Sequence, residues 1–188
     1  MERESRKKLA VLLSGRGTNF AHLVKHLHLK KYEIVCVCTN NPLAKGLEIA
    51  KEANIPYAII EPKDFKSREE YDEALVHYIR KYQPDLTVLA GFMRILTSVF
   101  IQHLPAINLH PSLLPRHKGL DAICRSYEDE YLEGGVSVHH VSSELDGGAL
   151  IVQKVLSKEG LTLEEYELQI HQLEKEALVE AIEIVCKV

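Results

Sequence analysis

The sequence lacks any apolar run long enough to cross a membrane, since a spanning helix needs about 20 apolar residues. The apolar run at residues 9–13 is also too short for the core of a signal peptide. Positive charge is not in excess either: the formal net charge is −4, which argues against a nucleic-acid surface. We therefore expect a cytoplasmic protein that binds neither membrane nor nucleic acid.

Cysteine is scarce and is not spaced for a metal site. Cys36 and Cys38 alternate with valines in a predicted strand, and no second pair completes a zinc-binding pattern. His22 and His26 have the i, i+4 spacing of a zinc protease helix, but Leu23 stands where such a helix needs glutamate. The sequence predicts buried, reduced thiols, a solvated histidine face and no metal.

The composition is that of an average globular protein. The 188 residues are 46% hydrophobic and 27% charged, and no repeat, low-complexity tract or linker interrupts them. This length is enough for one well-buried core. We expect a single domain over residues 1–188.

In the first half, strand and helix patterns alternate. Apolar runs are typical of strands buried on both faces of a parallel sheet, and the stretches between them have helical periodicity. Ser67 and Glu70 form a capping box at the start of one helix. The predicted strands are 9–13, 33–38, 57–60 and 86–90, and the predicted helices are 19–30, 43–53 and 67–82.

The second half has a different pattern. A short helix is predicted at 121–133, and a hairpin joins strands 136–141 and 149–155 through 142–148, with an Asp-Gly turn. A long helix begins after a second capping box, at Thr162 and Glu165. Its predicted apolar stripe is Tyr166, Ile170, Leu173, Ala177, Ala181 and Val185.

Asn108 and His110 are the strongest candidates for chemistry. They follow the apolar pair at 106–107, and residues i and i+2 of a strand point to the same face. Pro111 and Pro115 end any regular continuation, so the two side chains stand where a strand opens into a loop. Together they could donate to a developing oxyanion and move a proton at one reacting centre.

Residues 14–19, Ser-Gly-Arg-Gly-Thr-Asn, predict an anion site at the first strand-to-helix turn. The glycines allow backbone N–H groups to approach a phosphate, and the helix N-terminus adds partial positive charge. We do not expect a dinucleotide, because the segment lacks the G-x-G-x-x-G pattern and no acidic residue is visibly placed for a ribose. The alternative is an ordinary helix N-cap at Thr18 or Asn19.

Five segments in order resemble the folate-dependent formyltransferase family, and within it the enzymes that act on glycinamide ribonucleotide in purine biosynthesis. The wider family includes methionyl-tRNA formyltransferase and formyltetrahydrofolate deformylase. The phosphate loop and the short chain favour the glycinamide ribonucleotide enzymes, with no room expected for a tRNA-binding or regulatory domain. The segments are 14–19, 67–71, 89–96, 108–115 and 144–148.

The resemblance implies a Rossmann-like α/β fold with a mostly parallel sheet, a C-terminal β-hairpin and a long helix. It also implies attack of the substrate amine on the formyl carbon of 10-formyltetrahydrofolate, a co-substrate. Asn108 would stabilise the oxyanion, and His110 would act as an imidazolium. Asp146 would hold His110 and raise its pKa. Without the family, Asp146 reads as a turn residue.

Further site residues are implied in the same way. Some of them have simpler interpretations: Arg68 as an exposed charge and Glu174 as a solvated carboxylate. Four apolar residues would read as ordinary core: Phe92, Met93, Ile95 and Leu96. Ser137 and His139 share a strand face with the site by parity. The resemblance assigns Gly17, Thr18 and Asn19 to phosphate, Glu174 and His171 to the rest of the substrate, and Arg68, Met93, Arg94, Ile95, Leu96 and Asn108 to the folate.

The chain departs from the family pattern in two places. Residues 120–123, Leu-Asp-Ala-Ile, stand where one or two histidines are common, and Lys175 and Val179 replace a histidine and a proline. These positions concern substrate loops and not the reaction type. Two rival functions remain: a deformylase that uses water as acceptor, and a non-catalytic nucleotide- or folate-binding protein. The enzyme itself could be a monomer or a homodimer.

Overall fold

The computed structural model describes residues 6–187, so most of the charged N-terminal segment lies outside it. The chain forms two compact units, the first ending at Ala106 and the second beginning at Ile107. No helix within residues 6–187 is both long enough and apolar enough to cross a membrane.

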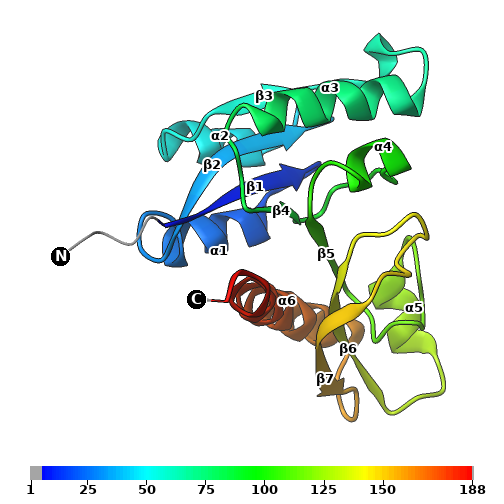
Figure 1. Cartoon of the computed structure of the whole chain (residues 1–188). Helices are drawn as coiled ribbons and strands as arrows, with labels where there is room; N and C mark the ends of the chain where they lie inside the picture. The colour runs from blue at the N-terminus through cyan, green and yellow to red at the C-terminus, as the bar shows by residue number, and fades with distance from the viewer. Residues whose placement is uncertain (1–5, 188) are drawn as a thin grey trace. The chain divides into compact units, whose positions relative to one another are not determined.

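Four parallel strands form the centre of the first unit, in the order β3-β2-β1-β4 (Figure 1). Leu12 of β1 pairs with Cys38 of β2 on one side and with Leu89 of β4 on the other. Nearly all residues of β1, β2 and β4 are buried, as expected for strands covered on both faces. The strands are β1 (Lys7–Leu13), β2 (Tyr32–Thr39), β3 (Tyr57–Ile59) and β4 (Leu86–Leu89).

The helices of the first unit are α1 (Thr18–His26), α2 (Gly46–Glu52), α3 (Arg68–Arg80) and α4 (Ser98–Ile101), with a 3-10 turn at Pro62–Asp64. α1 packs with α2 and α3 packs with α4, and α1 and α3 lie on opposite sides of the strands in Figure 1. The Ser67 hydroxyl caps α3 by accepting from the Glu70 amide. The Glu70 carboxylate instead accepts from the Lys66 amide, so only half of the predicted capping box forms.

The second unit has three antiparallel strands, β5 (Ala106–His110), β6 (Glu133–His140) and β7 (Leu150–Ser157). α5 (Ala122–Glu128) and the strands β6 and β7 all pack against the long helix α6 (Leu163–Cys186). Both bonds of the predicted capping box at Thr162 are present. The predicted α/β class, the C-terminal hairpin and the long helix are confirmed.

Two predicted helices are too long. The helix predicted at 19–30 ends at His26, because the chain turns at Leu29, which has a φ of 59° and cannot continue a helix. The helix predicted at 121–133 ends at Glu128, since the Asp129 carboxylate accepts from the Tyr131 amide and turns the chain toward β6. α4 and the 3-10 turn were not predicted, because such short helices have little periodicity.

The remaining boundaries differ by a few residues. α2 begins at Gly46 rather than residue 43, and β6 begins at Glu133 rather than residue 136. On α6 the predicted stripe was too narrow: Leu173 and Val185 are partly exposed, whereas Leu178, Ile182 and Glu174 are buried. The buried face is wider because α6 packs against α5 as well as two strands.

Candidate active site

The second unit brings together Asn108, His110 and Asp146. β5 supplies the first two, and the connection between β6 and β7 supplies the third. Asn108 Nδ2 donates to Asp146 Oδ1 at 3.2 Å, and His110 Nδ1 lies 3.4 Å from Asp146 Oδ2. The side chains of His110 and Asp146 are only 7% and 5% exposed. An amide, an imidazole and a carboxylate thus share one largely water-free cluster.

A local turn aims Asp146 at this cluster. The Gly147 amide donates to the Glu144 carbonyl at 3.2 Å, and Asp146 has a φ of 49°, a region that aspartate tolerates better than most residues. This turn lies within the connection between His140 and Leu150, where the sequence predicts an Asp-Gly turn. A Cβ on Gly148 would overlap the His140 carbonyl oxygen, so this connection needs glycine there.

The expected rise in the pKa of His110 is wrong in its net direction. Burial lowers the pKa of His110 below that of a free imidazole, and this effect outweighs the His117 carbonyl and the charge of Asp146, which both raise it. The sequence prediction considered the charge of Asp146 but not the desolvation of the buried His110 ring.

Asp146 stays ionised in this cluster. Burial by itself raises the pKa of the carboxyl, but the hydrogen bond from the Gly119 amide and the neighbouring rings of His139 and His110 together lower it. The Gly119 amide donates to Asp146 Oδ2 at 2.9 Å. His139 therefore belongs to the cluster, in line with the parity argument that placed it on this face.

His110 has a further partner that sequence reasoning missed. Its Nε2 lies 2.8 Å from the His117 carbonyl oxygen, and the His117 ring in turn contacts Asp129 Oδ2 at 2.6 Å. Lys158 Nζ donates to Asp129 Oδ1 at 2.6 Å and also to the Ser126 carbonyl. These contacts join segments far apart in the sequence, where no periodicity or motif indicates them.

The N-terminus of α1 is an anion-compatible site in the first unit. Its N-cap is Gly17, with a φ of 72°, so the alternative of a cap at Thr18 or Asn19 is wrong. Among the described residues no side chain caps this end, and the first turn contains no acidic residue. The first backbone N–H groups of the helix therefore remain available to an anion. A Cβ on Gly17 would lie 2.8 Å from the Gly46 Cα, so the turn also needs glycine for packing.

The segment at 92–96 is not simply core. Phe92 and Leu96 are buried, but Met93 and Ile95 are 62% and 47% exposed. Arg68 Nη2 donates to the Ile95 carbonyl at 2.7 Å, so this arginine is more than an isolated surface charge.

The same segment contacts the predicted phosphate loop. The Met93 amide donates to Ser14 Oγ at 2.8 Å, and the Ser14 amide donates to the Gly91 carbonyl at 3.0 Å. Arg94 lies over the Tyr71 ring, 4.6 Å from its centroid. The folate segment at 93–96 and the predicted phosphate loop are therefore in contact within the first unit.

Glu174 and His171 form a pair of their own on α6. Glu174 is 8% exposed, so the solvated interpretation of this carboxylate is wrong. His171 Nδ1 lies 2.8 Å from Glu174 Oε2, and this hydrogen bond raises the pKa of His171. A buried carboxylate next to a half-exposed imidazole can accept a hydrogen bond from a polar substrate group.

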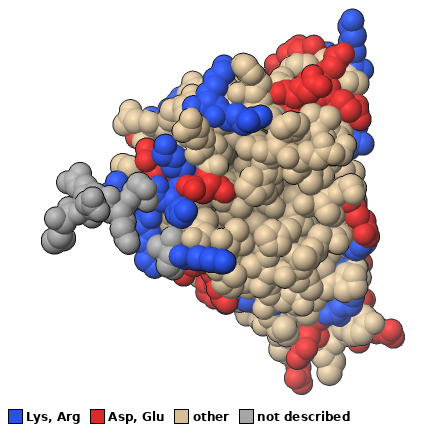
Figure 2. All heavy atoms as spheres, in the orientation of Figure 1, with Lys and Arg blue, Asp and Glu red and all other residues tan. Residues whose placement is uncertain are grey.

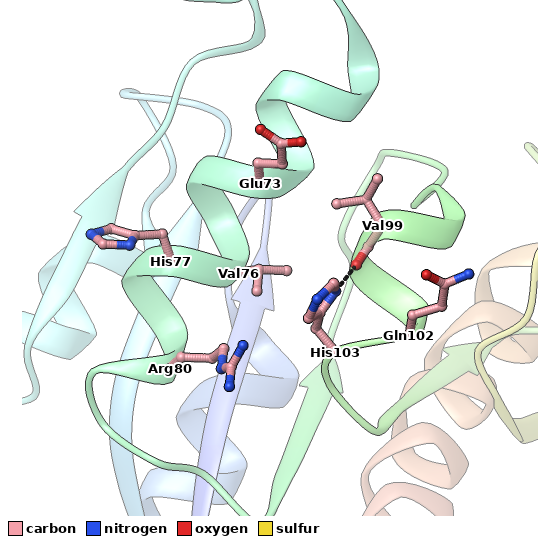
Figure 3. Close-up of a pocket in the computed structure, with 7 residues that line it drawn as sticks. All are labelled: Glu73, Val76, His77, Arg80, Val99, Gln102 and His103. Atoms are coloured by element: carbon pink, nitrogen blue, oxygen red, sulfur yellow. Dashed lines mark hydrogen bonds between the residues drawn. The ribbon is translucent and has the colours of Figure 1, made fainter.

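A groove of about 520 Å³ lies between α3 and α4, and none of the residues that line it is a predicted site residue (Figure 3). His103 Nδ1 faces the Val99 carbonyl oxygen there, and Glu73 and Arg80 bring opposite charges to its wall. On the face shown in Figure 2, residues of both charges are interspersed and much of the surface is uncharged.

The described residues contain no cluster of three or more side chains suited to a metal ion. All four cysteines lie in this part of the chain and are free of disulfides, with Cys36 and Cys38 buried as predicted.

Comparison with known proteins gives a consistent result. The sequence model of the family described as "Formyl transferase" matches residues 7–182, across both units. The chain is 42% identical over 151 residues to phosphoribosylglycinamide formyltransferase of Haemophilus influenzae, covering 78% of this chain and 71% of the relative. It is 35% identical over 174 residues to the Bacillus subtilis protein of the same name, covering 89% of each chain. The crystal structure of that enzyme from Campylobacter jejuni has a TM-score of 0.93 and 48% identity, covering 97% of this chain and 99% of that one.

Proposed function

The chain belongs to the formyl transferase family, and we propose that it transfers the formyl group of 10-formyltetrahydrofolate to the amine of 5'-phosphoribosylglycinamide, a step of purine biosynthesis. The amine nitrogen bonds to the formyl carbon, and the bond from that carbon to N10 of the folate breaks. One proton passes from the amine to N10. The reaction therefore needs a donor for the tetrahedral oxyanion and a group that moves a proton.

We assign these tasks to the buried cluster of the second unit. Asn108 Nδ2 donates to the oxyanion by sharing one of its two N–H groups between that oxygen and an acceptor it already has. His110 moves the proton, and the ionised Asp146 stabilises its imidazolium form against the effect of burial. The observation that supports this assignment most directly is the contact of Asp146 with both partners, at 3.2 Å to Asn108 and 3.4 Å to His110.

The remaining site residues bind and orient the substrates. Gly17, Thr18 and Asn19 hold the phosphate at the N-terminus of α1, where free N–H groups and the helix dipole favour an anion. Backbone groups of residues 93–96 hydrogen-bond the pterin, with Arg68 fixing this segment through the Ile95 carbonyl. Glu174 accepts from the glycinamide end of the substrate, next to His171.

The test is a turnover assay on purified protein with 10-formyltetrahydrofolate, with and without phosphoribosylglycinamide. We expect tetrahydrofolate and the formylated ribonucleotide only when both substrates are present. Release of formate without the ribonucleotide would identify a deformylase, and binding without turnover would identify a non-catalytic protein.

The proposal includes a cytoplasmic location, a single functional domain built from both compact units, and a monomer or homodimer as the active form. Light scattering during size-exclusion chromatography measures the oligomeric state.

Separate expression of residues 1–106 and 107–188 tests the single functional domain, since neither half alone contains both the predicted phosphate loop and the Asn108 cluster.

A further inference from the structure

His139 is a buried residue of the second unit that the proposed reaction does not use. It lies on β6 directly opposite Asn108 of β5, and its side chain is 3% exposed. Its Nε2 is 3.2 Å from Asn108 Nδ2, and its Nδ1 is 2.9 Å from the His140 carbonyl oxygen. Both ring nitrogens therefore have a polar partner, which holds the ring in one orientation.

These partners determine which nitrogen of His139 has the proton. A carbonyl oxygen only accepts hydrogen bonds, so Nδ1 is the protonated nitrogen. Asp146 Oδ1 also only accepts, so Asn108 Nδ2 donates one of its two hydrogens to it. The amide nitrogen of Asn108 thus faces the cluster, and its second hydrogen is available to His139 Nε2.

We propose that His139 is a positioning residue: in its neutral Nδ1–H form it accepts from Asn108 and, with Asp146, holds the amide nitrogen toward the reacting centre. Two acceptors fix the plane of the amide, whereas one acceptor leaves it free to turn about the remaining bond. A proton on Nε2 would instead point at Asp146 Oδ1, 3.5 Å away, and would displace the amide. The inference rests on the proposed function only for the role of Asn108.

The kinetic test uses three variants. His139→Phe keeps a planar ring but removes both nitrogens, and we expect kcat to fall roughly tenfold or more, since a misplacement of about 1 Å can cost about a hundredfold. KM for both substrates should stay within a few-fold. His139→Gln returns an acceptor oxygen and should recover most of kcat. The matched control is His140→Phe, because His140 is the exposed neighbour on the same strand and should tolerate the change.

A spectroscopic test needs no activity. The ring ¹⁵N signals of His139 should show a protonated Nδ1 and an unprotonated Nε2 near neutral pH. A protonated Nε2, or a folded His139→Phe protein with wild-type kcat, would overturn the proposal. If His139→Phe does not fold, the His139→Gln kinetics and the tautomer decide. A wild-type protein that forms no formylated ribonucleotide would refute the proposed function but leave the tautomer result standing.

Discussion

At the scale of single residues, the site depends on the balance between burial and charge. His110 is nearly inaccessible to water, and the resulting desolvation lowers its pKa more than Asp146 raises it. The same burial raises the pKa of Asp146, but the Gly119 amide and the neighbouring imidazoles outweigh this effect and lower the pKa. The carboxylate therefore limits the loss of basicity that burial imposes on the imidazole.

Asp146→Asn should lower the pKa of His110 further, because it removes the nearby negative charge at nearly constant volume. An NMR titration of the His110 ring measures the shift. The alkaline limb of the kcat profile should move to lower pH if His110 acts as an acid, and the acidic limb if it acts as a base. Asp64→Asn, a change at an exposed carboxylate, should leave both unchanged. An unchanged pKa of His110 in Asp146→Asn would show that Asp146 serves only as a turn residue.

Asn108→Ala should lower kcat by roughly a hundredfold or more, the usual effect of losing one oxyanion donor. KM for the ribonucleotide should change little, because the interaction with the oxyanion forms mainly in the transition state. Steady-state kinetics measure both quantities, and circular dichroism confirms that the variant is folded. A kcat within a few-fold of wild type would show that Asn108 has a structural role only.

At the scale of elements, one substitution at the N-terminus of α1 should stabilise the fold and at the same time weaken binding of the ribonucleotide. Thr18→Asp places a negative charge in the first turn, where no acidic residue is present. It should stabilise the protein by about 0.3–1 kcal/mol through the helix dipole. The same charge should repel the substrate phosphate and raise KM for the ribonucleotide, with KM for the folate unchanged.

Urea unfolding and steady-state kinetics test the Thr18→Asp prediction together, and Thr18→Asn is the neutral control. A stabilised variant with an unchanged KM for the ribonucleotide would refute phosphate binding at this helix end. Gly17→Val is a poorer test, because its Cβ would lie too close to Gly46 and its backbone has a positive φ.

Loss of the capping box of α6 should lower the stability of the fold. Thr162 Oγ1 accepts from the Glu165 amide at 3.2 Å, and Glu165 Oε2 accepts from the Thr162 amide at 2.8 Å. Thr162→Ala should therefore lower the free energy of unfolding by about 1 kcal/mol. Thr162→Ser keeps the acceptor and should lose much less. Equal losses in the two variants would show that the hydroxyl cap is not the stabilising feature.

At the scale of the whole molecule, acid should destabilise the fold below about pH 4. The pKa of Asp146 and that of Asp129 are lower in the folded chain than the ordinary value of 3.8. Such a carboxyl stabilises the fold above its unfolded pKa, and this contribution disappears as the pH falls through the folded pKa. Urea unfolding from pH 8 to pH 3 measures it, and Asp146→Asn should have a shallower acid slope. An identical acid slope in the wild type and in Asp146→Asn would show that the pKa of Asp146 is not lowered in the folded chain.

His110 and His171, whose pKa values move in opposite directions, change the stability of the fold at higher pH. His110 has a lowered pKa, so its contribution to stability is lost as the pH falls below 6.5. His171 has a raised pKa, so its contribution is present below 6.5 and is lost as the pH rises through the folded value.

The sequence by itself determined what depends on neighbours in the chain. The alternation of strands and helices, the caps at Ser67 and Thr162, and the common face of Asn108 and His110 follow from periodicity, side-chain type and parity. Helix ends were less certain, because a single residue such as Leu29 in the left-handed region stops a helix without disturbing the pattern before it.

Only the tertiary structure decided which distant residues meet and how far water is excluded from them. The contact of Asp146 with His110, the place of His139 beside Asn108, and the chain of contacts from His117 to Lys158 all join separate segments. The direction of the His110 pKa and the burial of Glu174 depend on desolvation, which sums over every atom that packs around a group. No local pattern of residues contains that sum, so the sequence alone could not predict the electrostatic environment of the site.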